Sequence, residues 1–240
     1  MAAAREDADL ETSSEEYARR FAGPVGAFLL ECQTQASLDL LASFRGAGIL
    51  DVGGGHGQLA GPLADAGHPV TVFGSDPRCR QRVSALVDSG RARFESGELL
   101  RLPYADQAYE VVLSYRLLPH VGRWTELIGE LCRVARRAVI VDYPTLRSFN
   151  LVGRSLFAAK KVVEGNTRPF RVFRDPEIAA AFAARGFRTT GRRGQFFFPM
   201  ALHRALGLAP LSRALEGLAA AVGLVAAFGS PVILRQERRG

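Results

Sequence analysis

The stretch Asp51-Val52-Gly53-Gly54-Gly55-His56-Gly57 follows the short apolar run Gly48-Ile49-Leu50. A buried strand that runs into several glycines predicts a strand-turn-helix unit, because glycine lets a backbone turn sharply and approach a ligand closely. The free amide groups at the start of the following helix can bind that ligand. A glycine turn without a ligand is disfavoured, since three consecutive glycines cost chain entropy and bury nothing. We therefore expect a ligand site at the end of this first strand.

Strands and helices alternate beyond this turn. The sequence predicts strands at about 69–73, 92–95, 109–114 and 138–142, and helices at about 57–66, 78–88 and 124–135. This alternation implies right-handed crossovers and a parallel sheet with helices on both faces, an α/β fold.

The two ends of the chain have a different texture. Thr12-Ser13-Ser14-Glu15 has the capping-box pattern and predicts a helix through about Phe21, and a second helix is expected over 25–44. The last third predicts a helix at 177–185, a strand at 187–198, mostly helix over 199–228 and a strand at 230–235. A chain of 240 residues fits one domain. Within residues 1–240 we expect a helical cover at 1–45, a ligand-binding core at 46–145, a basic cap insertion at 146–175 and C-terminal strands and helices at 176–240.

Composition excludes several classes of protein. Three scattered cysteines, without Cys-x-x-Cys spacing, predict neither a disulfide framework nor a metal site, and a reduced cytoplasmic compartment fits them best. The first residues lack a basic region followed by an apolar run, so no signal peptide is expected. The apolar stretch 217–229 is too short to span a bilayer, although peripheral membrane contact stays open. The oligomeric state does not follow from the sequence.

The net charge of +7 comes almost entirely from arginine. Arginine encoded by a GC-rich genome explains most of it, because these residues are spread along the whole chain. An anionic partner is the alternative.

Two kinds of ligand use a glycine turn of this sort. Gly55-His56-Gly57-Gln58-Leu59-Ala60 satisfies the dinucleotide pattern G-x-G-x-x-A, which by itself is a weak signal. Asp51 decides between them, because a carboxylate two residues before Gly53 does not help a pyrophosphate but can attract a cationic ligand. The resulting Asp-x-Gly-x-Gly-x-Gly resembles motif I of class I S-adenosylmethionine-dependent methyltransferases. That resemblance implies that Asp51, Gly53, Gly55 and Gly57 hold the amino-acid part of S-adenosylmethionine.

A second stretch extends the resemblance. Gly97-Glu98-Leu99-Leu100-Arg101-Leu102-Pro103-Tyr104-Ala105-Asp106, followed by 109–114, is similar to the type 11 branch, which includes ubiquinone- and menaquinone-methyltransferase-like proteins. The resemblance covers about residues 48–143, with further matches at 118–121 and 130–134. It implies that Glu98 accepts a hydrogen bond from adenine, that the Leu99 amide reaches the ring, and that Ser114 belongs to the cofactor site. It also implies a Rossmann-like, doubly wound, seven-stranded, mostly parallel sheet of order 3-2-1-4-5-7-6.

One position departs from the family pattern. The family usually ends its second strand with an acid that grips the ribose hydroxyls, and this chain has Gly74 there. Asp76 lies two residues later and could reach the ribose through a longer turn, or could instead cap the helix that begins at Pro77. Tyr17 and Arg20 are candidates for covering the cofactor, and packing of their helix on the core is the alternative.

The reaction of the family is a direct displacement at carbon, in which the enzyme mainly aligns the nucleophile and excludes water. A hydroxyl or phenol acceptor also needs a base. His120 is our candidate, because its ordinary pKa suits the role and it follows the fourth strand; a helix-capping histidine near Gly122 is the alternative. Asp142 and Tyr143, which end the fifth strand, are expected to face the acceptor, and Tyr115 and Arg116 are further candidates.

The insertion after the fifth strand interleaves basic and apolar residues. We expect it to close over an amphiphilic or anionic small molecule, such as a phenolic, quinone-like or lipid-linked compound, or merely to lid the sheet. A nucleic-acid (RNA) methyltransferase is disfavoured, because Ser114-Tyr115-Arg116-Leu117 stands where base-methylating enzymes carry Asn/Asp-Pro-Pro-Tyr/Phe. A non-catalytic relative that binds S-adenosylmethionine is the remaining alternative.

Overall fold

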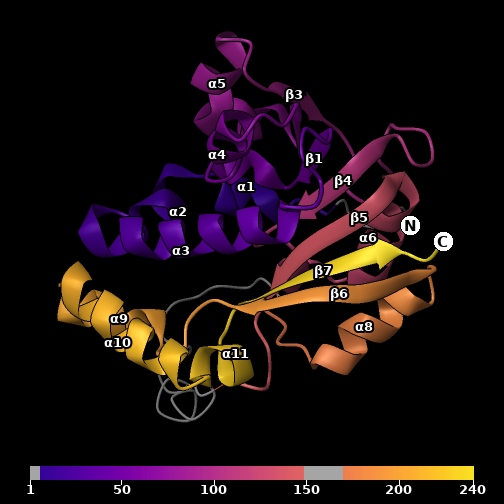
Figure 1. Cartoon of the computed structure of the whole chain (residues 1–240). Helices are drawn as coiled ribbons and strands as arrows, with labels where there is room; N and C mark the ends of the chain where they lie inside the picture. The colour runs from indigo at the N-terminus through magenta and orange to yellow at the C-terminus, as the bar shows by residue number, and fades with distance from the viewer. Residues whose placement is uncertain (1–5, 149–169) are drawn as a thin grey trace.

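A computed structural model describes residues 6–148 and 170–240, and its centre is one seven-stranded sheet (Figure 1). The strand order β3-β2-β1-β4-β5-β7-β6 confirms the predicted order. Strands β1 to β5 pair in parallel, and β7 runs antiparallel to both β5 and β6. The strands are β1 Ile49–Val52, β2 Val70–Gly74, β3 Arg93–Ser96, β4 Tyr109–Ser114, β5 Ala135–Tyr143, β6 Phe187–Gly194 and β7 Val232–Arg238.

Helices cover both faces of the sheet, as predicted. Those before and within the parallel part are α1 Asp9–Thr12, α2 Glu15–Arg19, α3 Gly23–Leu41, α4 Ala60–Asp65, α5 Ser84–Asp88 and α6 Trp124–Val134. Short 3-10 helices are η1 Gly54–His56, η2 Pro77–Val83 and η3 Leu118–His120. The C-terminal part adds α8 Asp175–Ala183, α9 Met200–Leu206, α10 Ala209–Ala221 and α11 Leu224–Phe228.

Several expected helices differ at their ends. The helix expected through about Phe21 is the shorter α2, which Ser14 caps by accepting a hydrogen bond from the Tyr17 amide at 3.1 Å, and a separate helix, α1, precedes it. The helix expected over 57–66 begins only at Ala60, because Gly57 has a φ of 70° and interrupts it. Strand β5 begins at Ala135, directly after α6, three residues earlier than expected. Most of the cap insertion, residues 149–169, lies outside the described residues.

The core has one layer on each face of the sheet because successive strand residues point to opposite sides. Leu50, Val52 and Val112 face α6 and α8, with Leu127, Leu131, Ile178 and Phe182 among their neighbours. Ile49, Val111 and Leu113 face the other way, toward Leu40, Leu41, Leu59 and Leu63 of α3 and α4. These strand residues are fully buried, and each contributes about 1.5–3 kcal/mol to the hydrophobic stabilisation of the fold.

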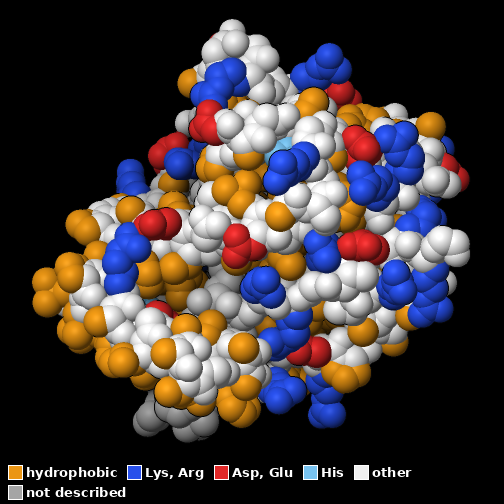
Figure 2. Space-filling view, viewed as in Figure 1, with side chains coloured by type: hydrophobic (Ala, Val, Ile, Leu, Met, Phe, Trp, Pro, Cys, Tyr) orange, Lys and Arg blue, Asp and Glu red, His pale blue; other side chains and the backbone are white. Residues whose placement is uncertain are grey.

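Helix α3 and the C-terminal helices α9 and α10 contact each other beyond one end of the sheet (Figure 1). Exposed hydrophobic side chains gather over α9–α11, whereas arginines are scattered over the rest of the visible face (Figure 2). No described helix is long and apolar enough to cross a membrane. This arrangement leaves a pocket between α3, α9 and the carboxyl ends of β4 and β5.

Candidate active site

The glycine turn leaves β1 as predicted and is tightly packed. Gly53 and Gly57 have φ values of 78° and 70°, in the left-handed region that favours glycine. A methyl group on Gly54 would lie 2.1 Å from Oδ2 of Asp51, so the turn folds back onto that carboxylate. The first and last glycines are therefore required for the backbone path, and the second for close contact with Asp51.

Asp51 is fully buried. Neither Oδ1 nor Oδ2 of its carboxylate has a hydrogen-bond partner among the described residues. Burial raises the pKa of Asp51 to about 7, and the charge of Asp142 adds to the effect. A buried carboxylate without partners is costly unless a cation or donor compensates it. The turn and this carboxylate therefore fit a ligand that carries positive charge, such as the amino-acid part of S-adenosylmethionine.

The N-terminal segment lies over this turn. Ala8 packs in the core layer that contains Val52, Phe73 and Leu99. A methyl group on Gly55 would lie 2.4 Å from the Ser13 hydroxyl, and one on Gly53 would lie 3.0 Å from the Leu117 side chain. Residues 8–13 and Leu117 thus cover the glycines that were predicted to hold the cofactor.

At the end of β2, the structure places a different carboxylate from the one expected. Asp76 caps η2, and its oxygens accept hydrogen bonds from the Arg78 amide at 2.8 Å and the Arg78 guanidinium at 2.9 Å. Asp9 is the carboxylate next to Gly74, because its Oδ2 accepts a hydrogen bond from the Ser75 amide at 2.7 Å. A contact between residues 66 positions apart has no local sequence signal, which is why Asp9 was not foreseen.

The predicted adenine contacts lie beyond β3. Glu98 is exposed, and Leu99 is buried at 1% exposure in the same core layer as Ala8. Ser114 ends β4 and is fully buried, with no hydrogen-bond partner for its hydroxyl among the described residues. Their roles stay predictions.

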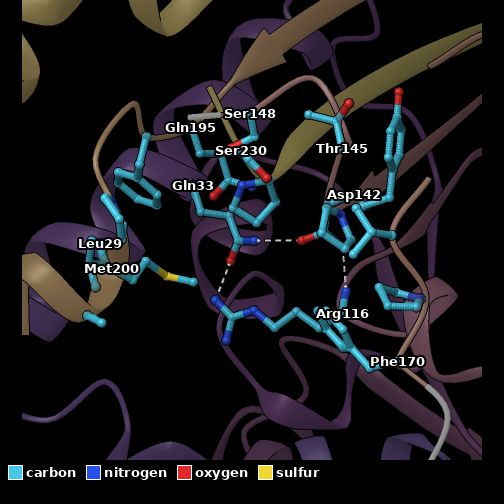
Figure 3. Close-up of a pocket in the computed structure, with 18 of the residues that line it drawn as sticks. Leu29, Gln33, Arg116, Asp142, Thr145, Ser148, Phe170, Gln195, Met200 and Ser230 are labelled. Carbon is cyan, nitrogen blue, oxygen red and sulfur yellow. Dashed lines mark hydrogen bonds between the residues drawn. The ribbon is translucent and has the colours of Figure 1, made fainter. Parts of the chain in front are cut away.

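A partly open pocket of about 510 Å³ lies beyond the carboxyl ends of β4 and β5 (Figure 3). Two of the predicted catalytic residues, His120 and Asp142, line it, together with Tyr17 of the predicted cover. Most of the other lining side chains are apolar: Phe21, Leu29, Pro119, Phe170, Val172, Phe196, Pro199 and Met200. A cavity of this size and character is typical of small-molecule sites.

Asp142 is the buried carboxylate of the pocket. Its Oδ1 accepts a hydrogen bond from the Arg116 amide at 2.6 Å, and its Oδ2 accepts one from Gln33 Nε2 at 3.3 Å. Burial raises the pKa of Asp142 to about 6, while the Arg116 amide and guanidinium hold it from rising further. A carboxylate with a pKa near neutrality can accept a proton under physiological conditions.

Gln33 connects this carboxylate to a cation. Its amide oxygen accepts a hydrogen bond from the Arg116 guanidinium at 2.7 Å, so Gln33 lies between Asp142 and Arg116 (Figure 3). Arg116 has a φ of 58°, in a region that non-glycine residues rarely adopt, and such backbone is common at functional sites. Gln33 was missed from the sequence. Its four-residue spacing from Leu29 and Ser37, both on the buried side of α3, was the available signal.

Of the two remaining catalytic candidates, His120 lies at the pocket and Tyr115 does not. The His120 ring packs 5.5 Å from that of Phe170, centroid to centroid, at the pocket wall. Tyr115 is instead fully buried in the layer that faces α3, and its hydroxyl lies 2.9 Å from that of Ser37. Its side chain follows Val111 and Leu113 in the two-residue alternation of the strand, so the structure does not bring Tyr115 to the pocket.

The two residues predicted to cover the cofactor lie together. The Arg20 guanidinium carbon is 4.9 Å from the centre of the Tyr17 ring. Tyr17 also lines the pocket, and its role in covering the cofactor stays a prediction. No cluster of metal-ligating side chains occurs in the described parts of the chain.

Comparisons with known proteins bear on the same region. The sequence model of the family described as "Methyltransferase domain" matches residues 49–138. A demethylmenaquinone methyltransferase of Deinococcus radiodurans is 31% identical over 168 residues, which cover 60% of this chain and 69% of that protein. A ubiquinone biosynthesis O-methyltransferase of Rhizobium etli is 24% identical over 65% of this chain and 66% of its own length. An uncharacterized methyltransferase of Mycobacterium avium is 34% identical over 39% of this chain, and the match spans only 37% of that relative.

Solved structures share the fold. Magnesium protoporphyrin IX methyltransferase from Synechocystis, with bound SAH, superposes with a TM-score of 0.65 at 15% identity and covers 94% of both chains. The 1,6-didemethyltoxoflavin-N1-methyltransferase of Burkholderia thailandensis gives a TM-score of 0.59 at 16% identity over 87% of this chain and 79% of that one. At such identities the likeness concerns the fold.

Proposed function

Because the chain belongs to the family of class I S-adenosylmethionine-dependent methyltransferases, we propose that it transfers a methyl group to a small, largely apolar acceptor. The observation that supports this proposal best is the pocket with mostly apolar walls that Asp142 and His120 both line. When bound, S-adenosylmethionine supplies a methyl group that its sulfonium has already activated. The residues of this chain have to bind it, orient the acceptor, exclude water and manage one proton.

The cofactor is proposed to bind at the glycine turn. Asp51, without partners in its buried place, would compensate the positive charge of the amino-acid part, and Gly53, Gly55 and Gly57 would allow close approach of the backbone. Glu98, Leu99 and Ser114 are the proposed contacts on the adenine side and beside β4. Residues 8–13 lie over this turn, so binding would require that segment to move.

The acceptor is proposed to be phenolic, quinone-like or lipid-linked. A pocket of about 510 Å³ with mostly apolar walls suits one or two fused rings with an apolar substituent. Relatives named as demethylmenaquinone and ubiquinone-biosynthesis methyltransferases support this class. A nucleic acid is not the proposed acceptor, because Asp142, the candidate proton acceptor, is only 3% exposed in a pocket with mostly apolar walls.

Asp142 is our first candidate for the proton acceptor. With a pKa raised to about 6, its carboxylate is ionised at neutral pH and can take the proton of an acceptor hydroxyl as the methyl group is transferred. The Arg116 amide and Gln33 orient that carboxylate, and His120, which also lines the pocket, is the second candidate.

Transfer of radiolabelled methyl from S-adenosylmethionine to a panel of phenols and hydroxyquinones tests this function. Asp142→Asn and His120→Gln are the informative variants, and Asp65→Asn, on the exposed surface, is the matched control. We expect loss of a proton acceptor to lower the rate by about a hundredfold or more. Absence of S-adenosylmethionine binding in calorimetry would overturn the proposal. Full activity of both pocket variants would refute the assigned roles.

A further inference from the structure

Among the described residues that line the pocket, arginines outnumber carboxylates. Arg116 and Arg204 both line it, and no ion pair joins either guanidinium to a carboxylate in the described parts of the chain. The Arg116 side chain reaches Gln33 rather than Asp142, so the neutral amide of Gln33 separates the two charges. The other terminal nitrogen of Arg116, Nη1, is buried without a hydrogen-bond partner.

Both arginines lie against the same aromatic ring. The guanidinium carbons of Arg116 and Arg204 are 4.2 and 5.7 Å from the centre of the Phe21 ring. The adjacent Arg20 lies over Tyr17, with Glu11 at 3.6 Å as its partner. Three guanidinium groups therefore approach the end of the pocket formed by α2 and α9.

The positive charges of these arginines repel one another. The pKa of Arg204 is lowered, first by burial and then by the charge of Arg20, and Arg204 acts in the same direction on Arg116. The ionised Asp142 balances one positive charge of the pocket at most. A surplus of positive charge next to apolar walls is complementary to a ligand that carries both an acidic group and an apolar body.

We propose that the acceptor carries an acidic group, a carboxylate or a phosphate, which binds to Arg116 and Arg204 while its apolar body fills the pocket toward Asp142 and His120. This inference rests on the proposed function and narrows its acceptor to anionic molecules. It also orients the acceptor. The acidic group lies on the guanidinium side of Gln33, so the atom that receives the methyl group lies on the side of Gln33 that faces Asp142.

Binding of three probes of matched shape tests the inference without turnover. Naphthoate and naphthyl phosphate carry the two acidic groups, and naphthamide is the neutral counterpart of naphthoate. We expect at least one anionic probe to bind about tenfold more tightly than naphthamide, a difference of about 1.4 kcal/mol. Tight binding of naphthoate alone would indicate a carboxylate, and tight binding of naphthyl phosphate alone would indicate a phosphate.

Two variants locate the effect. Arg204→Gln should remove most of the preference for the anionic probe and leave naphthamide binding unchanged. Arg91→Gln, which alters an arginine paired with Asp65 on the surface, should leave all three affinities unchanged. Equal binding of naphthamide and both anions, or an unchanged preference in Arg204→Gln, would overturn the inference. Calorimetry with S-adenosylmethionine on the same samples tests the proposed function separately, so failure of one is distinguishable from failure of the other.

Discussion

Replacing Gly55 with alanine adds one methyl group at a crowded point of the glycine turn. That methyl carbon would lie 2.4 Å from the Ser13 hydroxyl, 2.7 Å from the Cys79 carbonyl oxygen and 2.9 Å from the Cys79 Cβ. Ser13 belongs to the N-terminal segment and can be displaced. The Cys79 carbonyl belongs to the backbone of η2, so the turn or η2 has to shift.

The expected magnitude combines two opposing effects. Overpacking of this kind costs about 1–3 kcal/mol, and the lower entropy of the unfolded alanine chain returns about 0.4–1 kcal/mol. We expect Gly55→Ala to lower the free energy of unfolding by about 1–2 kcal/mol. Gly61→Ala is the matched control, because a methyl group there meets nothing within 4 Å and the residue lies in α4, where alanine stabilises a helix by about 0.5–1 kcal/mol.

Urea unfolding of the two variants beside the parent chain measures this difference, which should reach about 2–3 kcal/mol between the variants. Calorimetry should also show weaker S-adenosylmethionine binding in Gly55→Ala and unchanged binding in Gly61→Ala. The reasoning would be refuted if Gly55→Ala and Gly61→Ala had equal free energies of unfolding and Gly55→Ala bound S-adenosylmethionine as tightly as the parent chain.

Three further predictions concern buried carboxylates. The raised pKa of Asp51, about 7, means that the folded chain binds a proton more tightly than the unfolded chain between about pH 4 and 7. The contribution of Asp51 to the free energy of unfolding is therefore greatest below about pH 4 and falls as the pH rises through 7. Asp51→Asn should flatten this decline when the free energy of unfolding is measured in urea at several pH values. An unaltered dependence of that free energy on pH would contradict the prediction. Glu216 accepts a hydrogen bond from buried His203 at 2.9 Å, so Glu216→Ala should lower the free energy of unfolding by about 2–4 kcal/mol, and a parental melting temperature would argue against this. Asp9→Asn should weaken the attachment of the N-terminal segment to the Ser75 amide, which faster hydrogen exchange over residues 8–14 would reveal and unchanged exchange would disprove.

Local patterns were sufficient for the parallel part of the fold. Strand β1 is fully buried, as the apolar residues Ile49, Leu50 and Val52 indicate, and β4 has the predicted bounds 109–114. The strand order came from the family resemblance, and the structure confirms it. The N-terminal helices were less predictable, because helices of 4 and 5 residues depend on their tertiary contacts rather than on their own propensity.

The bounds of β4 were predicted correctly, but the direction of the Tyr115 side chain, which follows this strand, was not. Val111 and Leu113 face α3, so the alternation along β4 sends the next odd residue to Ser37 and away from the pocket. Asp142 was expected at the pocket and lines it, but its partner Gln33 lies 109 positions away in the chain. Such a pairing has no short-range pattern.

The sequence by itself determined the strand-turn-helix with Asp51 and the glycines, because turn geometry and burial are local properties of a few neighbouring residues. Only the tertiary structure decided what surrounds that turn. Asp9 reaches the end of β2, residues 8–13 cover the glycines, and Arg116 and Arg204 meet at Phe21 through packing of segments from both ends of the chain. These contacts depend on how the helices cross the sheet, and therefore on the packing of the whole core.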